Sequence, residues 1–81
     1  TSTEARELRQ EARSRVEAAL QRVPEPFRSA IVIKEIAGMP LKEAASVLGV
    51  KQATMKTRLH RARLALRKQL DQDLRSALSE A

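Results

Sequence analysis

The residues best suited to chemistry in this chain are cations that lie between Lys51 and Lys68, a stretch without any acidic residue. There are seven of them: Lys51, Lys56, Arg58, Arg61, Arg63, Arg67 and Lys68. Residues 4–17, by contrast, alternate four glutamates with four arginines. The net charge is +6, and its concentration in one stretch indicates a polyanionic partner.

Other kinds of chemistry find little support in the residues. There is no cysteine, which excludes disulfides, thiolate nucleophiles and cysteine-based zinc sites. His60 is the only histidine, and a metal site would need further ligands. Since there is also no phosphate-binding glycine loop and no nucleophile–base set, we expect no enzymatic activity, cofactor, metal or small-molecule substrate. No signal peptide or membrane-spanning run is visible, so we expect a cytoplasmic domain without membrane contact.

The basic stretch has the periodicity of an amphipathic helix. At about 100° per residue, with Lys56 set at 0°, four apolar side chains cluster between about 240° and 300°. These are Met55, Leu59, Ala62 and Leu66. A polar set falls between about 0° and 140° and consists of Lys56, Thr57, His60 and Arg61. One face is therefore expected to pack inward and the other to meet a partner.

Four helices are expected to position this face, at about 3–22, 26–36, 41–48 and 51–70. Pro24 and Pro26 separate the first two helices, because proline cannot extend a helix but suits its first turn. Gly38 and Gly49 are expected to end the second and third helices in a left-handed conformation. With 81 residues and few glycines and prolines, the chain is expected to form one all-α domain.

The apolar pattern also predicts how these helices pack. Thr1 and Glu4 could form a capping box at the start of the first helix. An apolar seam follows along that helix, made of Ala5, Leu8, Ala12, Val16, Ala19, Leu20 and Val23. The second helix is apolar almost all round and is expected to be the most buried element. After Leu66 the leucines drift around the helix, so the tail is expected to leave the core and to pack on the first helix, fray or meet a partner.

The third and fourth predicted helices fit a helix-turn-helix. Ala45 provides the small residue where two helices touch, and Gly49 provides the turn. The crossing would be packed by Ala44, Leu48, Val50, Met55 and Leu59. In such a motif the second helix enters the major groove of DNA.

Together with its flanks, this motif resembles region 4 of the extracytoplasmic-function sigma factors of bacterial RNA polymerase. The resemblance covers about Val16 to Leu70. It is carried by Leu20, Val23-Pro24-Glu25-Pro26-Phe27, Ile36, Gly38-Met39-Pro40-Leu41, Glu43-Ala44-Ala45, Leu48-Gly49-Val50, the run from Ala53 to Arg63, and Leu66-Arg67. The family often has isoleucine at position 44, glycine at 53 and valine at 55, whereas this chain has Ala44, Ala53 and Met55. None of these departures removes a polar contact.

The resemblance implies a domain that binds the promoter −35 element as part of a sigma factor. The base-proximal residues would be Lys56, Thr57, His60 and Arg61, and the phosphate-proximal residues would be Lys51, Thr54, Arg58 and Arg63. It also implies docking on the β-flap of RNA polymerase and inhibition by an anti-sigma factor. Residues 1–23 would then be a linker-proximal helix, 24–70 the helix-turn-helix core and 71–81 a tail. A second domain, which binds the −10 element in this family, would lie outside the chain, so we expect an excised or separately expressed domain.

Two alternatives stay open at this point. A stand-alone helix-turn-helix regulator would bind DNA as a dimer and would recognise a palindromic site. A protein-interaction module with a basic amphipathic helix would bind an acidic partner or a membrane surface and would show no preference among DNA sequences. The separation of the polar set from the apolar set on the fourth predicted helix favours DNA.

Overall fold

The computed structural model describes residues 2–80, which form four helices and no strand. The helices are α1 (Ser2–Leu20), α2 (Glu25–Ile31) with a π-helical turn η1 (Val32–Ile36) directly after it, α3 (Leu41–Leu48) and α4 (Gln52–Glu80). The predicted all-α, four-helix architecture is confirmed.

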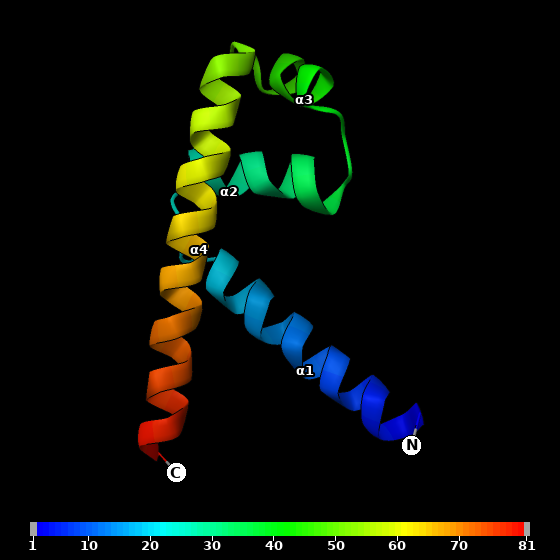
Figure 1. The fold of residues 1–81 in the computed structure, drawn as a ribbon, viewed down its shortest axis with the longest axis vertical. Coiled ribbons are helices and arrows are strands. Elements are labelled where there is room, and N and C mark those ends of the chain that lie inside the picture. The colour runs from blue at the N-terminus through cyan, green and yellow to red at the C-terminus, as the bar shows by residue number, and fades with distance from the viewer. Residues whose placement is uncertain (1, 81) are drawn as a thin grey trace.

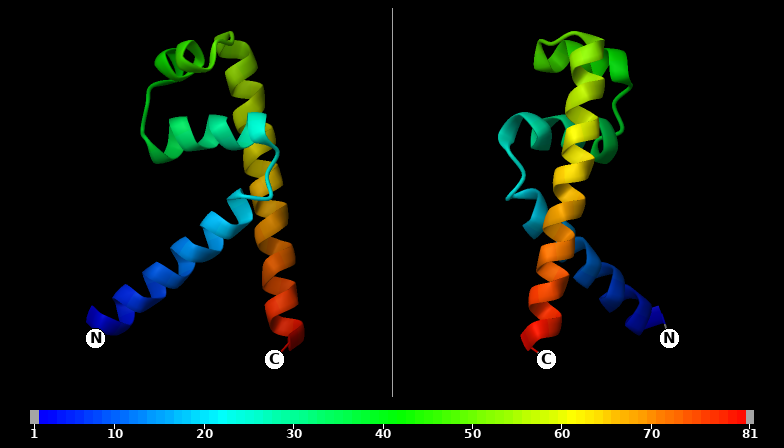
Figure 2. Two further views of the ribbon diagram at one scale, coloured as in Figure 1. Left: turned by 180° about the vertical axis from the view of Figure 1, so that it is seen from behind. Right: turned by 60° about the vertical axis from the view of Figure 1, so that its left-hand side comes forward.

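The long helix α4 organises the molecule (Figure 1). Helix α3 lies at the N-terminal end of α4, and α2 crosses α4 further along. The C-terminal end of α1 contacts α4, whereas the N-terminal end of α1 points away from α4. Figure 2 shows this divergence from two further directions. The radius of gyration is 14.9 Å, whereas a compact chain of this length would have about 12 Å. The larger value reflects the two protruding helical segments.

Prolines and glycines set the helix ends as predicted. Pro24 and Pro40 occupy the positions before α2 and α3, with extended ψ values of 143° and 150°. Pro26 lies in the first turn of α2, where its missing N–H has no intrahelical partner to lose. Gly38 and Gly49 have φ values of +73° and +68°, a region that favours glycine because it has no Cβ.

The second helix differs from the continuous α-helix expected at 26–36. In η1 the Ala37 N–H donates to the Val32 carbonyl oxygen at 2.9 Å, a bond between residues five apart. No residue of η1 is fully buried, and 67% of Ile36 is exposed. Val32 and Ile33 still pack against the core at partial burial, so the expectation that this element is the most buried fails only at its end, where Glu35 and Ile36 are exposed.

The core consists of two clusters along the inner side of α4. The first contains Ala30, Ala44, Ala45, Met55 and Leu59 and joins α4 to α2 and α3. The second contains Leu20, Ile31 and Ala62, and Phe27 and Leu66 pack against it at partial burial. Since alanines make up much of the first cluster, the helix backbones can approach closely there.

Most of α1 lies outside this core. Its predicted seam is buried only near its end, at Ala19 and Leu20, with Val23 buried just after the helix. Leu8 is 67% exposed, and Val16 is also exposed. The predicted seam is therefore exposed over the N-terminal part of α1, because α1 diverges from α4 there. The proposed capping box includes Thr1, which lies outside the described residues.

Helix α4 continues past its expected end at about residue 70 and runs to Glu80. Leu74 and Leu78 are exposed, as the drift of the leucines predicts. The Asp73 carboxylate accepts a hydrogen bond from the Arg22 guanidinium, which links this segment to the end of α1. Of the three possibilities for the tail, packing on the first helix is the nearest to what is seen, but the contact is an ion pair to Arg22, just past the end of α1, and involves no leucine.

Candidate nucleic-acid interface

The turn between α3 and α4 is a Schellman motif centred on Gly49. The Val50 N–H donates to the Ala45 carbonyl oxygen at 2.9 Å, and the Gly49 N–H donates to that of Ser46 at 3.1 Å. These two bonds satisfy carbonyl groups that would otherwise be free at the end of α3. Because Ala45 is itself buried against the core, the motif fixes the direction in which α4 leaves the turn.

The inward face of α4 is the predicted one. Met55 and Ala62 are fully buried, Leu59 is 4% exposed, and Leu66 is half-buried against the second cluster. The helix is therefore held in a single rotational setting about its axis. The direction of every polar side chain in the same turns follows from that setting.

The four base-proximal candidates share the outward face. Lys56, Thr57, His60 and Arg61 are all exposed. The Thr57 hydroxyl donates to the Ala53 carbonyl oxygen at 3.2 Å, so its hydrogen is already engaged within the helix. Thr57 therefore offers a partner its oxygen as an acceptor and its methyl group for apolar contact. Arg61 forms no ion pair within the described part of the chain, so its guanidinium can donate to a guanine edge.

Three of the phosphate-proximal candidates flank this outward face. Lys51 is exposed just before α4, while Thr54 in the first turn and Arg58 in the second are half-buried. Neither Lys51 nor Arg58 takes part in an ion pair among residues 2–80. Their charges are thus not neutralised by protein carboxylates, and the N-terminal end of α4 adds the positive end of its helix dipole.

The fourth phosphate-proximal candidate, Arg63, is held by another residue of the protein. Its guanidinium donates to the carboxylate of Glu35 in η1. This hydrogen bond, together with the positive charge of Arg63, lowers the pKa of Glu35 below its ordinary value. A phosphate would have to compete with Glu35 for Arg63, so this arginine is less available than Lys51 or Arg58. Glu35 was not among the predicted site residues, and no local signal in the chain marks it.

An apolar groove lies away from the outward face of α4, between the end of α1, the α2–η1 segment and α3. It has a volume of about 410 Å³ and is lined by Leu20, Gln21, Arg28, Ser29, Val32, Ile33 and Leu48. Arg28 holds its rim in place, since its guanidinium donates to the Glu25 carboxylate at 2.5 Å and to the Gln21 carbonyl oxygen at 3.2 Å. The Ser29 hydroxyl also donates to Glu25, and these bonds lower the pKa of that carboxyl group.

Neither a metal site nor a membrane segment is found within residues 2–80. No group of three or more acidic or histidine side chains is arranged to bind a metal ion there. None of the helices is both long enough and apolar enough to cross a membrane.

Comparison with known proteins agrees with this geometry. Residues 13–66 match the family described as Sigma-70, region 4. The chain is 42% identical over 52 residues to the ECF RNA polymerase sigma factor SigE of Mycolicibacterium smegmatis, an alignment that covers 64% of this chain and 20% of SigE. It is 40% identical over 55 residues to the ECF RNA polymerase sigma factor SigW of Bacillus subtilis, with 68% of this chain and 29% of SigW covered.

A third relative extends the alignment to nearly the whole chain. The RNA polymerase sigma-H factor of Pseudomonas aeruginosa is 34% identical over 76 residues, which cover 94% of this chain and 39% of that factor. The chain thus spans between about a fifth and two fifths of the length of these curated relatives. The family match includes α2, α3, the turn at Gly49 and the buried part of α4. The chain therefore belongs to the sigma-70 region 4 family.

Proposed function

We propose that this chain reads the −35 element of promoters as part of a sigma factor that directs RNA polymerase to its start sites. One observation carries the proposal: packing of Met55, Leu59 and Ala62 turns a polar face of α4 outward, and the cations on that face form no ion pair among residues 2–80. A helix packed in this way presents its outward side chains to the major groove.

Each side chain has a role suited to its chemistry. Arg61 donates to the O6 and N7 atoms of a guanine, a contact that contributes about 1–3 kcal/mol of discrimination. Thr57 contacts a thymine methyl group or accepts from an amino group, and Lys56 and His60 contact neighbouring base edges or phosphates. Lys51, Thr54 and Arg58 hold phosphates and set the register of α4 on the duplex. Arg63 joins them when a phosphate displaces Glu35.

Fluorescence anisotropy with labelled duplexes tests this reading. Candidate −35 sequences and scrambled sequences of equal length would be titrated at several salt concentrations. Arg61→Ala should reduce the affinity ratio between the two duplexes by roughly 5- to 150-fold, the equivalent of 1–3 kcal/mol. Arg75→Ala removes the same charge from the exposed far end of α4 and should leave that ratio unchanged. Equal affinity of the unsubstituted protein for every duplex would refute sequence-specific reading.

We further propose that the apolar groove docks the β-flap of RNA polymerase, and that an anti-sigma factor inhibits by covering it. The support is its lining, since Val32, Ile33 and Leu48 give an apolar floor suited to a partner side chain. The isolated domain would then bind DNA weakly. The holoenzyme would gain affinity because polymerase docking raises the effective concentration of the domain at the promoter.

Two matched substitutions separate this docking from DNA binding. Val32→Glu places a charge in the groove, whereas Ile36→Glu places the same charge one turn further along, on an exposed side chain that does not line it. Binding to a purified β-flap fragment, measured by gel filtration or calorimetry, should be lost in the first variant and kept in the second. Both variants should still bind duplex DNA. Equal loss of flap binding in both variants would contradict the assignment of the groove.

A further inference from the structure

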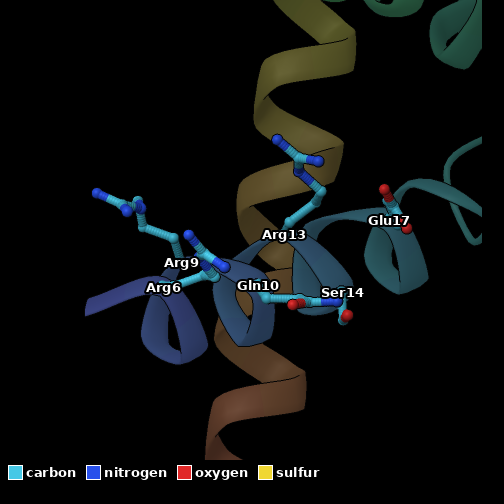
Figure 3. A pocket seen from close by; sticks show the side chains of 6 residues that line it. All are labelled: Arg6, Arg9, Gln10, Arg13, Ser14 and Glu17. Carbon is cyan, nitrogen blue, oxygen red and sulfur yellow. The ribbon is translucent and has the colours of Figure 1, made fainter. Parts of the chain in front are cut away.

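The exposed side of α1 carries a second group of cations, far along the chain from those of α4. A cavity of about 510 Å³ lies against this helix, and it is lined by Arg6, Arg9, Gln10, Arg13, Ser14 and Glu17. Figure 3 shows the three guanidinium groups on the same side of α1, with Gln10 and Ser14 beside them and Glu17 at the end nearest the core. Every lining side chain is polar, and all six residues are exposed.

The spacing of the arginines brings their charges together. Arg6, Arg9 and Arg13 fall within about 60° around the helix and extend over about 10 Å of its axis. None of them forms an ion pair within the described residues. By comparison, Arg15 lies on another side of α1, where it pairs with Glu11 at 3.2 Å. The three guanidinium groups therefore repel one another, with Glu17 as the one carboxylate in the lining, and an anion bound across them would relieve that repulsion.

We propose that Arg6, Arg9 and Arg13 bind the phosphate backbone of duplex DNA, as a sequence-independent contact separate from the reading surface of α4. Arginine suits this role because its planar guanidinium can donate two parallel hydrogen bonds to one phosphate. Gln10 and Ser14 add neutral donors beside the charged ones.

The composition of the lining argues for duplex DNA over other polyanions. An acidic protein partner would bury an apolar centre inside a polar rim, and no apolar side chain lines this cavity. Single-stranded nucleic acid is held largely by stacking of bases on aromatic rings, and the lining contains none. Interfaces with duplex DNA are polar and positive, and this surface is entirely polar with three arginines against one glutamate.

Glu17 sets a limit to the contact. Its carboxylate lies at the inner end of the arginine group, so a phosphate strand would run over the N-terminal part of α1 and away from it. Replacing Glu17 with glutamine removes the repulsion of that strand without reducing side-chain size. Glu17→Gln is therefore expected to tighten binding, a change that damage to the fold would not produce.

Salt titrations of the full 81-residue chain with a scrambled 20-base-pair duplex test the proposal. The Arg6→Gln/Arg9→Gln/Arg13→Gln variant should lower the slope of log affinity against log salt by up to about 2.7, or about 0.9 for each lost phosphate contact. A control variant, Arg15→Gln/Lys34→Gln/Arg75→Gln, removes the same net charge from other surfaces, keeps the Arg22–Asp73 ion pair and should lower the slope by less than about 0.9. Circular dichroism would verify equal helix content.

The outcomes separate this inference from the proposed function. Equal slope changes in the two triple variants, or no change in either, would overturn the α1 contact. The α1 contact would also be overturned if the Arg6→Gln/Arg9→Gln/Arg13→Gln variant lost binding to poly-L-glutamate while its DNA binding stayed unaltered. That result would assign the arginines to an acidic protein. The preference of the unsubstituted protein for a −35 duplex over the scrambled one tests the α4 reading on its own, because the α1 contact is measured entirely on scrambled DNA.

Discussion

Replacing Leu59 with alanine should destabilise the protein by about 3 kcal/mol. Leu59 is 4% exposed and lies in the cluster that joins α4 to α2 and α3. The substitution removes three carbon atoms, which lose roughly 2.4 kcal/mol of burial free energy at about 0.8 kcal/mol each. Its neighbours Ala30, Ala44 and Ala45 cannot extend into the space, whereas flexible Met55 can fill part of it. A partly filled cavity adds the remaining fraction of a kilocalorie.

Leu64→Ala is the matched control, since it makes the same chemical change on the same helix. Leu64 is 56% exposed, so the loss of burial should be about 1 kcal/mol at most. Both substitutions gain the same small helix propensity of alanine over leucine, which cancels in the comparison. The variants should therefore differ by about 2 kcal/mol or more, a large share of the roughly 4–12 kcal/mol expected for a domain of this size.

Urea unfolding followed by circular dichroism at 222 nm measures this difference. With a denaturant dependence of about 1 kcal/mol per molar for so small a protein, Leu59→Ala should lower the midpoint by about 3 M and Leu64→Ala by about 1 M or less. A starting midpoint below 3 M would leave Leu59→Ala unfolded in water. Equal midpoint shifts would refute the rotational setting of α4, and with it the argument that its polar face meets DNA.

Three further predictions concern the turn, the ion pairs and the end of the chain. Gly49→Ala should lower the free energy of unfolding by about 1–2 kcal/mol, as measured by thermal unfolding. The cause is backbone strain at φ +68° alone, since nothing lies within 4 Å of the added Cβ. An unchanged free energy of unfolding would contradict the left-handed turn. The hydrogen bond and ion pair with Arg63 lower the pKa of Glu35, so the stability that this carboxylate contributes is present above about pH 4.5 and is lost as the pH falls below that value. Glu35→Gln should therefore lose less stability between pH 5 and pH 3 than the unsubstituted protein. Truncation after Leu70 removes the partly exposed Arg22–Asp73 pair and should lower stability by about 1 kcal/mol or less, as thermal melts would show.

The outward polar face of α4 was largely predictable from the sequence. Helical periodicity relates the directions of side chains a few residues apart, so burial of Met55 and Leu59 implies exposure of Thr57 and Arg61. The left-handed turn at Gly49 was predictable for a similar reason, because one residue type favours that backbone conformation. Both inferences depend on neighbours along the chain and require no knowledge of which helices touch.

Features that depend on contacts between distant segments could not be predicted. Glu35 and Arg63 are 28 residues apart, and they meet because α2 and η1 cross α4 at that level. A helix that is apolar on most sides can be buried to several depths, and only the structure shows that Ile36, at the end of the π-helical turn, is exposed.

The direction of α1 is the clearest case of this division. Its residues predict a helix with an apolar seam, and such a seam usually lies against a second helix. In the structure, burial near Ala19 and Leu20 and the Arg22–Asp73 ion pair fix only its end, and the rest diverges from α4 (Figure 1). Local sequence therefore decides which face of each helix is apolar, polar or charged. The crossings of the helices decide which of those faces meet and which, like the arginines of α1, remain open to a partner.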